Sequence, residues 1–265
     1  MTSLTRTRSK GYMPTKVFKT IVADRSGSMS SFGGKQYDMA EHLLQDAKKQ
    51  AVDTQKSTEV TFVTFDDEPQ DLMRDRDLLT EDIPIRHELE AALCPRATTK
   101  FNDTLIQEIE RLLEKKAEYL ASLSKDVRKL NPDVATVLIA ITDGADNSSS
   151  KTVFEARRTM VEFRENGGRA ILMAANMDAE IIGGRYGFNP DKAITVHNSD
   201  ERAIECCYRA VSQMARNVTQ GIDVPFSPLQ RNLSQTPNTV PSSPNSFIPS
   251  LAASLGIPQL PLKRA

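Results

Sequence analysis

Oxygen-bearing side chains follow the first apolar run of the sequence at a regular spacing. The stretch IVADRSGSM, residues 21–29, places Asp24 two positions before Ser26 and four positions before Ser28. A second apolar run, ATVLIAITDG at 135–144, ends at Asp143. Alternate residues of an extended segment project to the same side, so Asp24, Ser26 and Ser28 can line one concavity. Gly27 lets that segment turn tightly.

This set of oxygens favours a hard divalent cation. Two carboxylates held close together repel each other unless a cation lies between them or one of them takes a proton. Hydroxyl and carboxylate oxygens suit Mg²⁺, Mn²⁺ or Ca²⁺ better than Zn²⁺. Mg²⁺ takes about six oxygens. Two serines, a third hydroxyl, the acids and water can supply five of them, which leaves one position open.

The elements that must position these residues alternate along the chain. Apolar strands are predicted at 16–23, 58–67, 135–144, 169–176 and 192–198, and helical periodicity marks 36–52, 101–123, 152–168 and 200–218. A short antiparallel edge strand is expected within 68–96, and a short glycine-rich helix near 179–188. This alternation predicts an α/β fold with a doubly wound, mainly parallel sheet and helices on both faces. Ligands of such sheets bind beyond the carboxyl ends of the strands, where the strand order reverses.

Helix ends and helix faces give finer predictions. We expect Asn102 or Asp103 to cap the helix at 101–123, and Asp200 to cap the helix at 200–218. The latter helix carries an apolar face that ends at Val218, where we expect the core to end.

Composition excludes several functional classes. Lysine plus arginine number 34 against 35 for aspartate plus glutamate, a net charge of −1, which argues against a dedicated nucleic-acid binder. The three cysteines, Cys94, Cys206 and Cys207, form no zinc-type cluster and indicate free thiols in a reducing compartment. The sequence shows no signal peptide and no apolar run long enough for a membrane span, so a cytoplasmic location is expected, or a virion if the protein is virus-encoded.

The two ends differ in character from the middle. Residues 1–15 are basic without acids, which indicates a solvated, mobile arm or, alternatively, one that seeks phosphate or lipid. Eight of the fourteen prolines lie between Pro225 and Pro261. We therefore expect no regular helix or central strand in residues 222–265, which serve as a plain tail or as a segment docked on a partner or on its own domain. Residues 16–221 remain as the folded domain.

The residues resemble a von Willebrand factor A domain. DRSGS, a hydroxyl in ATTKFNDTL and TDG after an apolar strand match that family's metal-ion-dependent adhesion site. The resemblance implies the Rossmann-like fold of that family, and a site formed by Asp24, Ser26, Ser28, Thr99 and Asp143. Thr98 is the adjacent candidate for the threonine. The stretches TDGADNSSS and AANMDAEIIGGRYGF look most like small intracellular or virus-encoded members.

The resemblance also implies a mechanism. Asp24 and Asp143 bring two negative charges to a divalent cation, while the hydroxyls add none, so a partner protein's Glu or Asp can supply the last ligand. Arg25 lies inside the loop; we expect its side chain to be exposed, with a pair to a nearby acid as the alternative.

Two other functions compete with a metal-dependent interaction module. In one, the same fold serves as a structural component of an assembly, and its site is empty or purely structural. In the other, the metal hydrolyses phosphoesters. Phosphatases with an aspartate nucleophile need a second acid two places later, where this chain has Ser26. No phosphate-binding loop or nucleophile elbow is present in the sequence, and no histidine lies near the motif, so the sequence favours a non-enzymatic protein.

Overall fold

Strands and helices alternate through most of the chain, as predicted. The computed structural model describes residues 15–235 apart from 97, 145 and 199. The strands are β1 (Lys16–Asp24), β2 (Thr58–Phe65), β3 (Pro69–Asp77), β4 (Val134–Thr142), β5 (Arg169–Ala175) and β6 (Ala193–Val196). The helices are α1 (Lys35–Thr54), α2 (Arg86–Ala92), α3 (Phe101–Ser122), α4 (Lys125–Lys129), α5 (Val153–Glu165), α6 (Ala179–Tyr186), α7 (Glu201–Thr219) and α8 (Pro228–Gln235). Short 3₁₀ helices span Gly27–Phe32 and Pro190–Lys192.

The strands form one sheet in the order β3-β2-β1-β4-β5-β6. β1 pairs in parallel with both β2 and β4, β5 pairs in parallel with β4 and β6, and β3 is an antiparallel edge strand on β2. The predicted doubly wound sheet with one antiparallel edge is therefore confirmed. Strand order reverses between β1 and β4, so the switch point lies where Asp24 and Asp143 leave the sheet.

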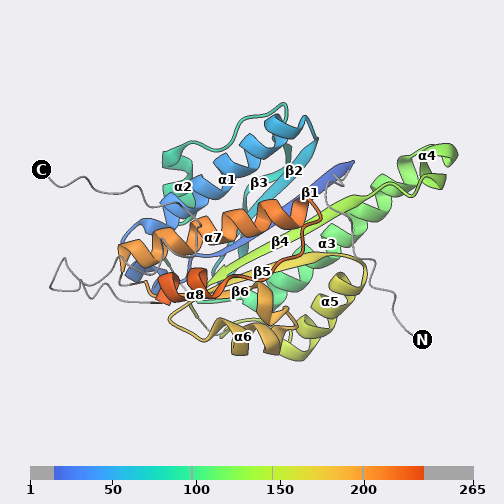
Figure 1. Ribbon diagram of the computed structural model, residues 1–265. Coiled ribbons are helices and arrows are strands. Elements are labelled where there is room, and N and C mark those ends of the chain that lie inside the picture. The colour runs from blue at the N-terminus through green and yellow to red at the C-terminus, as the bar shows by residue number, and fades with distance from the viewer. Residues whose placement is uncertain (1–14, 97, 145, 199, 236–265) are drawn as a thin grey trace, which may run out of the picture.

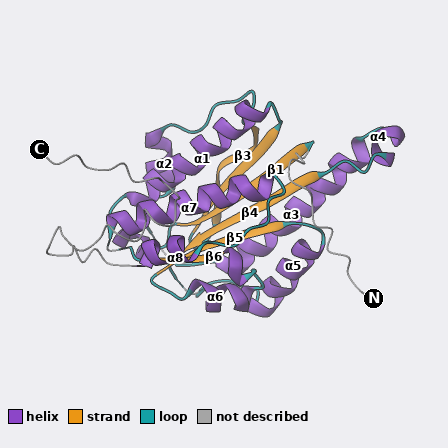
Figure 2. Cartoon of the chain, in the orientation of Figure 1, coloured by secondary structure: helices purple, strands orange, loops and turns teal. Residues whose placement is uncertain are grey.

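Helices cover both faces of this sheet (Figures 1 and 2). One buried apolar cluster joins the sheet to α1, α2 and α7, and the other joins it to α3, α5 and α6. Successive residues of β1 alternate between the two clusters: Ile21 belongs to the first and Val22 to the second. Strands apolar on both sides are what a parallel sheet between two helical layers requires. Within the described residues, no helix has both the length and the apolar character needed to cross a membrane.

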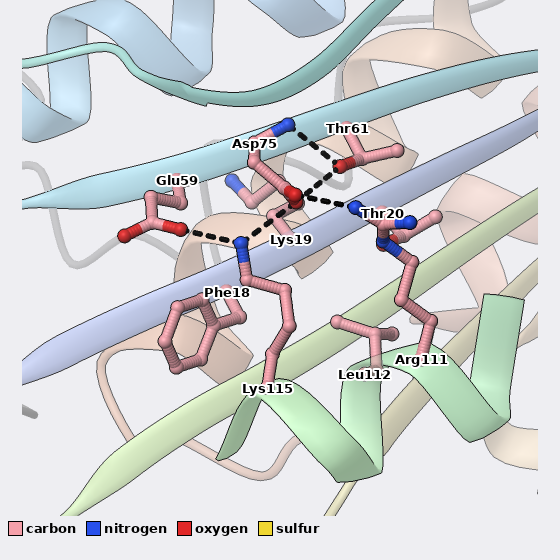
Figure 3. A pocket seen from close by; sticks show the side chains of 9 residues that line it. All are labelled: Phe18, Lys19, Thr20, Glu59, Thr61, Asp75, Arg111, Leu112 and Lys115. Carbon is pink, nitrogen blue, oxygen red and sulfur yellow. Dashed lines mark hydrogen bonds and ion pairs between the residues drawn. The ribbon is translucent and has the colours of Figure 1, made fainter. Parts of the chain in front are cut away.

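A charged cluster lies between α3 and the outer strands on the second face (Figure 3). Asp75 of β3 pairs with Arg111 Nη2 at 2.5 Å and with Lys115 Nζ at 2.7 Å. Lys115 also pairs with Glu59 of β2 at 2.6 Å. These pairs fasten α3 to the β2–β3 hairpin, so we assign the hollow they line a structural role.

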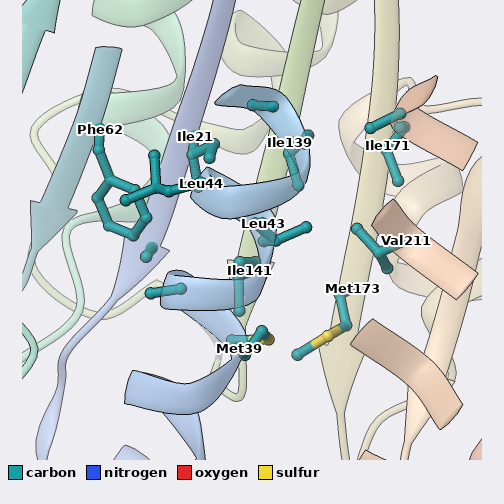
Figure 4. Packing of buried hydrophobic residues seen from close by; sticks show 14 of the residues in the cluster. Ile21, Met39, Leu43, Leu44, Phe62, Ile139, Ile141, Ile171, Met173 and Val211 are labelled. Carbon is teal, nitrogen blue, oxygen red and sulfur yellow. The ribbon is translucent and has the colours of Figure 1, made fainter. Parts of the chain in front are cut away.

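The first face is packed by the periodic apolar residues of α1 (Figure 4). Met39, Leu43 and Leu44 are buried against Ile139 and other strand residues, as the helical spacing of the sequence predicts. Beside α1, on the same face of the sheet, α7 contributes the apolar face predicted for it. Its buried members include Ile204, Cys207, Val211, Met214 and Val218.

Of the two predicted helix caps, one is confirmed and one is wrong. The Asp200 side chain accepts from the backbone nitrogens of Arg202 and Ala203 at the start of α7. Helix α3 instead begins at Phe101, after Lys100, and has no side-chain cap at that position. Asn102 therefore lies inside the helix, and its backbone nitrogen donates to Asp146 Oδ2 at 2.7 Å. A loop distant in sequence takes over the capping.

The segment after α7 also differs from the prediction. Residues 228–235 form α8, so the expectation that no regular helix lies beyond residue 222 is wrong for them. Pro228 occupies the first helical position, where a missing N–H costs nothing. Phe226 is buried in the first apolar cluster, and the His197 nitrogen, just past β6, donates to Ser234 O at 3.0 Å. The expectations for residues 1–14 and 236–265 lie outside the described residues, and the division at 15 and 222 stays a prediction.

Candidate metal centre

Asp24 is the last residue of β1 and is fully buried. Its Oδ1 accepts from the backbone nitrogen of Ser26 at 2.7 Å, and its Oδ2 accepts from the hydroxyl of Thr142 at 2.7 Å. Thr142 ends the neighbouring strand β4. The loop after β1 thus orients one carboxylate oxygen and the end of β4 orients the other, which fixes the direction in which Asp24 presents its charge.

A chain of side-chain oxygens leads from this carboxylate to Asp143. The hydroxyls of Ser26 and Ser28 lie 3.0 Å apart, and Ser28 Oγ donates to Asp143 Oδ1 at 2.7 Å. The 3₁₀ helix that begins at Gly27 turns the chain so that Ser28 reaches Asp143, the residue just after β4. Four of the five residues that the resemblance implies therefore form one hydrogen-bonded row, from Asp24 through Ser26 and Ser28 to Asp143.

Thr99, rather than Thr98, joins this group. Thr98 is exposed, whereas Thr99 retains 3% of its accessible surface. A Cβ atom placed on Gly144 would lie 3.6 Å from Thr99 Oγ1 and 3.8 Å from Ser28 Oγ, so both hydroxyls lie close to one point beside Asp143. Within the described part of the chain, no hydrogen-bond partner is found for the Thr99 hydroxyl. The lack of a Cβ on Gly144 keeps this space open.

The loop between β4 and α5 holds Thr99 in place, which sequence reasoning missed. Asn147 Oδ1 accepts from the Thr99 nitrogen at 2.9 Å, and the Asn147 nitrogen donates to Thr99 O at 3.0 Å. Asp146 of the same loop accepts from Asn102 and Ser149. The signal was the dense run of Asp, Asn and Ser in ADNSSS, because these side chains bind nearby backbone groups in turns.

The two acids are held in conditions that disfavour their charge. Burial raises the pKa of Asp24 to about 6, although hydrogen bonds from Ser26 and Thr142 oppose that shift. Burial also raises the pKa of Asp143, against the hydrogen bond from Ser28. A divalent cation beside both groups would reverse these shifts, because an opposite charge favours the ionised form.

Arg25 corrects one expectation. Its side chain is buried, with 2% of the residue's surface accessible, so the prediction of an exposed side chain is wrong and the alternative, a pair with an acid, holds. Arg25 Nη2 donates to Asp66 Oδ1 at 3.1 Å, and its Nε lies 3.1 Å from Asp66 Oδ2. Asp66 follows β2 directly, so its position beside β1 comes from strand pairing and could not be read from local sequence.

The donor set fits a hard cation. Among residues 15–235, with the three gaps named above, no group of three or more His, Cys, Asp or Glu residues is placed to hold a metal. The pair of Asp24 and Asp143 would therefore need other oxygen donors, and hydroxyl groups lie beside it. Two carboxylates and three hydroxyls make up the set: Asp24, Ser26, Ser28, Thr99 and Asp143. Such oxygen donors are the ligands that Mg²⁺, Mn²⁺ and Ca²⁺ accept.

Solved structures place this architecture in a known class. No protein-family model and no curated protein sequence matches the chain. The von Willebrand factor domain of the type V pili tip protein Mfa5 from Porphyromonas gingivalis superposes with a TM-score of 0.51, at 9% identity, over 80% of this chain and 98% of that one. The domain has the von Willebrand factor A fold.

Two larger proteins share the likeness. The PilB minor pilin of Streptococcus sanguinis, as a D319A mutant, gives a TM-score of 0.53 at 13% identity, over 82% of this chain and 65% of that one. Proximal thread matrix protein 1 of the mussel byssus gives 0.50 at 13% identity, over 79% of this chain and 49% of that one. The chain thus spans about half the mussel protein and less than two thirds of the pilin. At these identities the likeness is one of fold, and the role of the site is argued from its own residues.

Proposed function

We propose that this von Willebrand factor A domain is a protein-interaction module that binds a divalent cation, Mg²⁺ or Mn²⁺ with Ca²⁺ as an alternative, and through it an acidic residue of a partner protein. The observation that carries the proposal is the row of oxygens from Asp24 through Ser26 and Ser28 to Asp143. The Thr99 hydroxyl beside Gly144, for which the described residues provide no hydrogen-bond partner, completes the set.

The charges of this chain's own residues explain why such a site favours an anionic partner. Asp24 and Asp143 together carry two negative charges when both are ionised, and the three hydroxyls carry none. The cation, when bound, would supply an electrophile for one more hard, anionic oxygen. The Asp24 carboxylate is held by Ser26 and Thr142 and has little freedom to move, so the site is preorganised for that ligand.

Calorimetry tests the cation. Wild-type protein titrated with Mg²⁺, Mn²⁺ or Ca²⁺ is expected to bind one ion, with a Kd between micromolar and millimolar, and Asp24→Asn is expected to abolish the signal. Asp53→Asn serves as the control, because Asp53 lies at the end of α1 with an exposed side chain paired to Lys49. Equal heats for wild type and Asp24→Asn would refute the assignment.

Affinity capture from native lysate tests the interaction. We expect one protein to be retained by wild type with magnesium, and lost both with EDTA and with Asp24→Asn. Mutating each acid of the identified partner in turn should then show one that is essential. Retention that is indifferent to EDTA would place the contact on another surface.

We propose that the domain is not an enzyme. The position two residues after Asp24 holds Ser26, whose hydroxyl contacts Ser28 and provides no second acid for phosphoryl transfer. Wild-type protein with magnesium should therefore leave generic phosphoesters intact, and turnover lost with Asp24→Asn would contradict this part.

A cytoplasmic location, or a virion for a virus-encoded chain, also remains a proposal. The three free cysteines support it, since Cys94 is exposed and would be open to oxidation outside a reducing compartment. Cell fractionation, or purification of virions, would decide the location.

A further inference from the structure

Asp66 is a buried carboxylate next to the candidate metal centre but outside its donor set. It follows Phe65, the end of β2, and retains 1% of its accessible surface. Its carboxylate accepts from Arg25 Nη2 at 3.1 Å and from Arg96 Nε at 2.7 Å. Two guanidinium groups from different parts of the chain thus converge on one acid.

The backbone repeats this convergence. The Arg25 nitrogen donates to Phe65 O at 2.9 Å, the Arg96 nitrogen donates to Arg25 O at 2.8 Å, and the Lys100 nitrogen donates to Asp66 O at 2.7 Å. Arg25 lies between Asp24 and Ser26, while Arg96 and Lys100 lie on either side of Thr99. Three loops, after β1, after β2 and before α3, are therefore tied together at Asp66.

Burial makes this junction stiff. Arg25 retains 2% of its surface, and its Nη1 donates to Gln70 Oε1 at 2.6 Å. An unpaired charge in such a place is strongly unfavourable, so Arg25 and Asp66 hold each other in position. The loop of Asp24, Ser26 and Ser28 cannot shift relative to the loop of Thr99 without breaking this pair or the bond between Arg96 and Arg25.

We propose that Asp66 is a positioning residue for the metal centre, which acts through Arg25 and Arg96 to hold Thr99 in register with the Asp24 loop. This rests on the proposed function, since the register matters for a cation that both loops must contact. The alternative is that the cluster acts on the site only as a set of nearby charges.

Substitutions of opposite charge separate the two roles. Asp66→Asn removes a negative charge and Arg96→Gln removes a positive one. A through-space effect on a cation predicts weaker binding for the first variant and tighter binding for the second. Positioning predicts weaker Mg²⁺ binding for both, by tenfold or more for Asp66→Asn and by threefold or more for Arg96→Gln.

The cluster around Asp75 provides matched controls (Figure 3). Asp75 is also a carboxylate held by two cations, Arg111 and Lys115, but it lies farther down the sheet on β3. Asp75→Asn and Arg111→Gln are expected to lower the melting temperature while they leave the Mg²⁺ Kd within twofold of wild type. The change in Kd relative to these controls therefore separates positioning from a general loss of stability.

Each result decides the proposal. Weaker binding by both Asp66→Asn and Arg96→Gln, with the controls unchanged, supports it; opposite effects of the two, or Kd values within twofold of the controls, overturn it. Should Asp66→Asn fail to fold, Arg96→Gln decides alone. The Arg96 side chain is 57% exposed, so its replacement is compatible with folding. Wild type that binds no cation would refute the proposed function instead.

Hydrogen exchange measured in EDTA then tests the junction without a cation. Arg96→Gln should speed amide exchange in both residues 24–28 and residues 96–100. Unchanged exchange in either segment would overturn the proposed positioning role.

Discussion

Phe226 offers a direct test of where the folded domain ends. The apolar periodicity of the sequence predicts a core that stops near Val218, and on that basis deletion of residues 223–265 would shift the melting temperature by only a few degrees. The structure instead buries Phe226 to 2% exposure in the same cluster as α1 and α7, with its nitrogen bonded to Asp191 O at 3.0 Å. Truncation of a buried phenylalanine to alanine costs about 3–5 kcal/mol of unfolding free energy.

Urea denaturation of the full chain measures this cost. Phe226→Ala should lower the free energy of unfolding by about 3–5 kcal/mol, which for a domain of this size corresponds to a fall in melting temperature of roughly 6–20 °C. Leu229→Ala is the matched control three residues on, because Leu229 is 65% exposed and should change stability by less than about 0.5 kcal/mol. A Phe226→Ala variant within about 1 kcal/mol of wild type would show that the segment after α7 does not complete the core.

Three further predictions concern the metal centre. In EDTA, raising the pH from 4 to 7 should destabilise wild type relative to Asp24→Asn by about 2 kcal/mol. A folded-state pKa of about 6 against an unfolded value near 4 stabilises the fold only while Asp24 is protonated, and this stabilisation is lost as the pH rises through the folded pKa. Parallel urea curves for the two proteins across that range would contradict the raised pKa. Thr99→Ala should lower the free energy of unfolding by only about 1 kcal/mol, while it weakens Mg²⁺ and partner binding at least tenfold. Calorimetry that finds an unchanged affinity for Mg²⁺ would remove Thr99 from the donor set. Gly144→Ala should fold normally, since the new methyl group would lie at ordinary contact distances of 3.6 Å from Thr99 Oγ1 and 3.8 Å from Ser28 Oγ. The same methyl group should weaken Mg²⁺ binding, because it would fill the space between the two hydroxyls. Tight Mg²⁺ binding by this variant would place the cation elsewhere.

The sheet and its central site could be predicted because their signals are local. Continuous apolar runs such as β4, buried along its whole length, are typical of strands covered on both faces. The spacing of Asp24, Ser26 and Ser28 predicts a shared direction, and the alternation of elements predicts the edge at which Asp143 joins them. The structure brings these four residues into one hydrogen-bonded row.

Two of the misses depend on contacts between distant segments, and the third on the position of a single proline. Arg25 is polar and follows a strand, so nothing local indicates that Asp66, forty-one positions later, buries it. Helix α3 lacks its own cap because the loop holding Asp146 supplies the acceptor. For residues 228–235 the proline content of the segment predicts no helix, although one proline at the first helical position is compatible with α8.

The central site also has a consequence for how the protein folds. Its closing bonds join residues far apart in the chain: Thr142 to Asp24 across 118 positions, and Ser28 to Asp143 across 115. Parallel pairing of β1 with β4 requires closure of a long loop, which makes it an intrinsically slow step. A nascent chain that has emerged only as far as β3 carries the first three donors but neither Thr99 nor Asp143. Cation uptake would therefore be a late event in biosynthesis, and the time at which it occurs would mark the moment when the two halves of the sheet have joined.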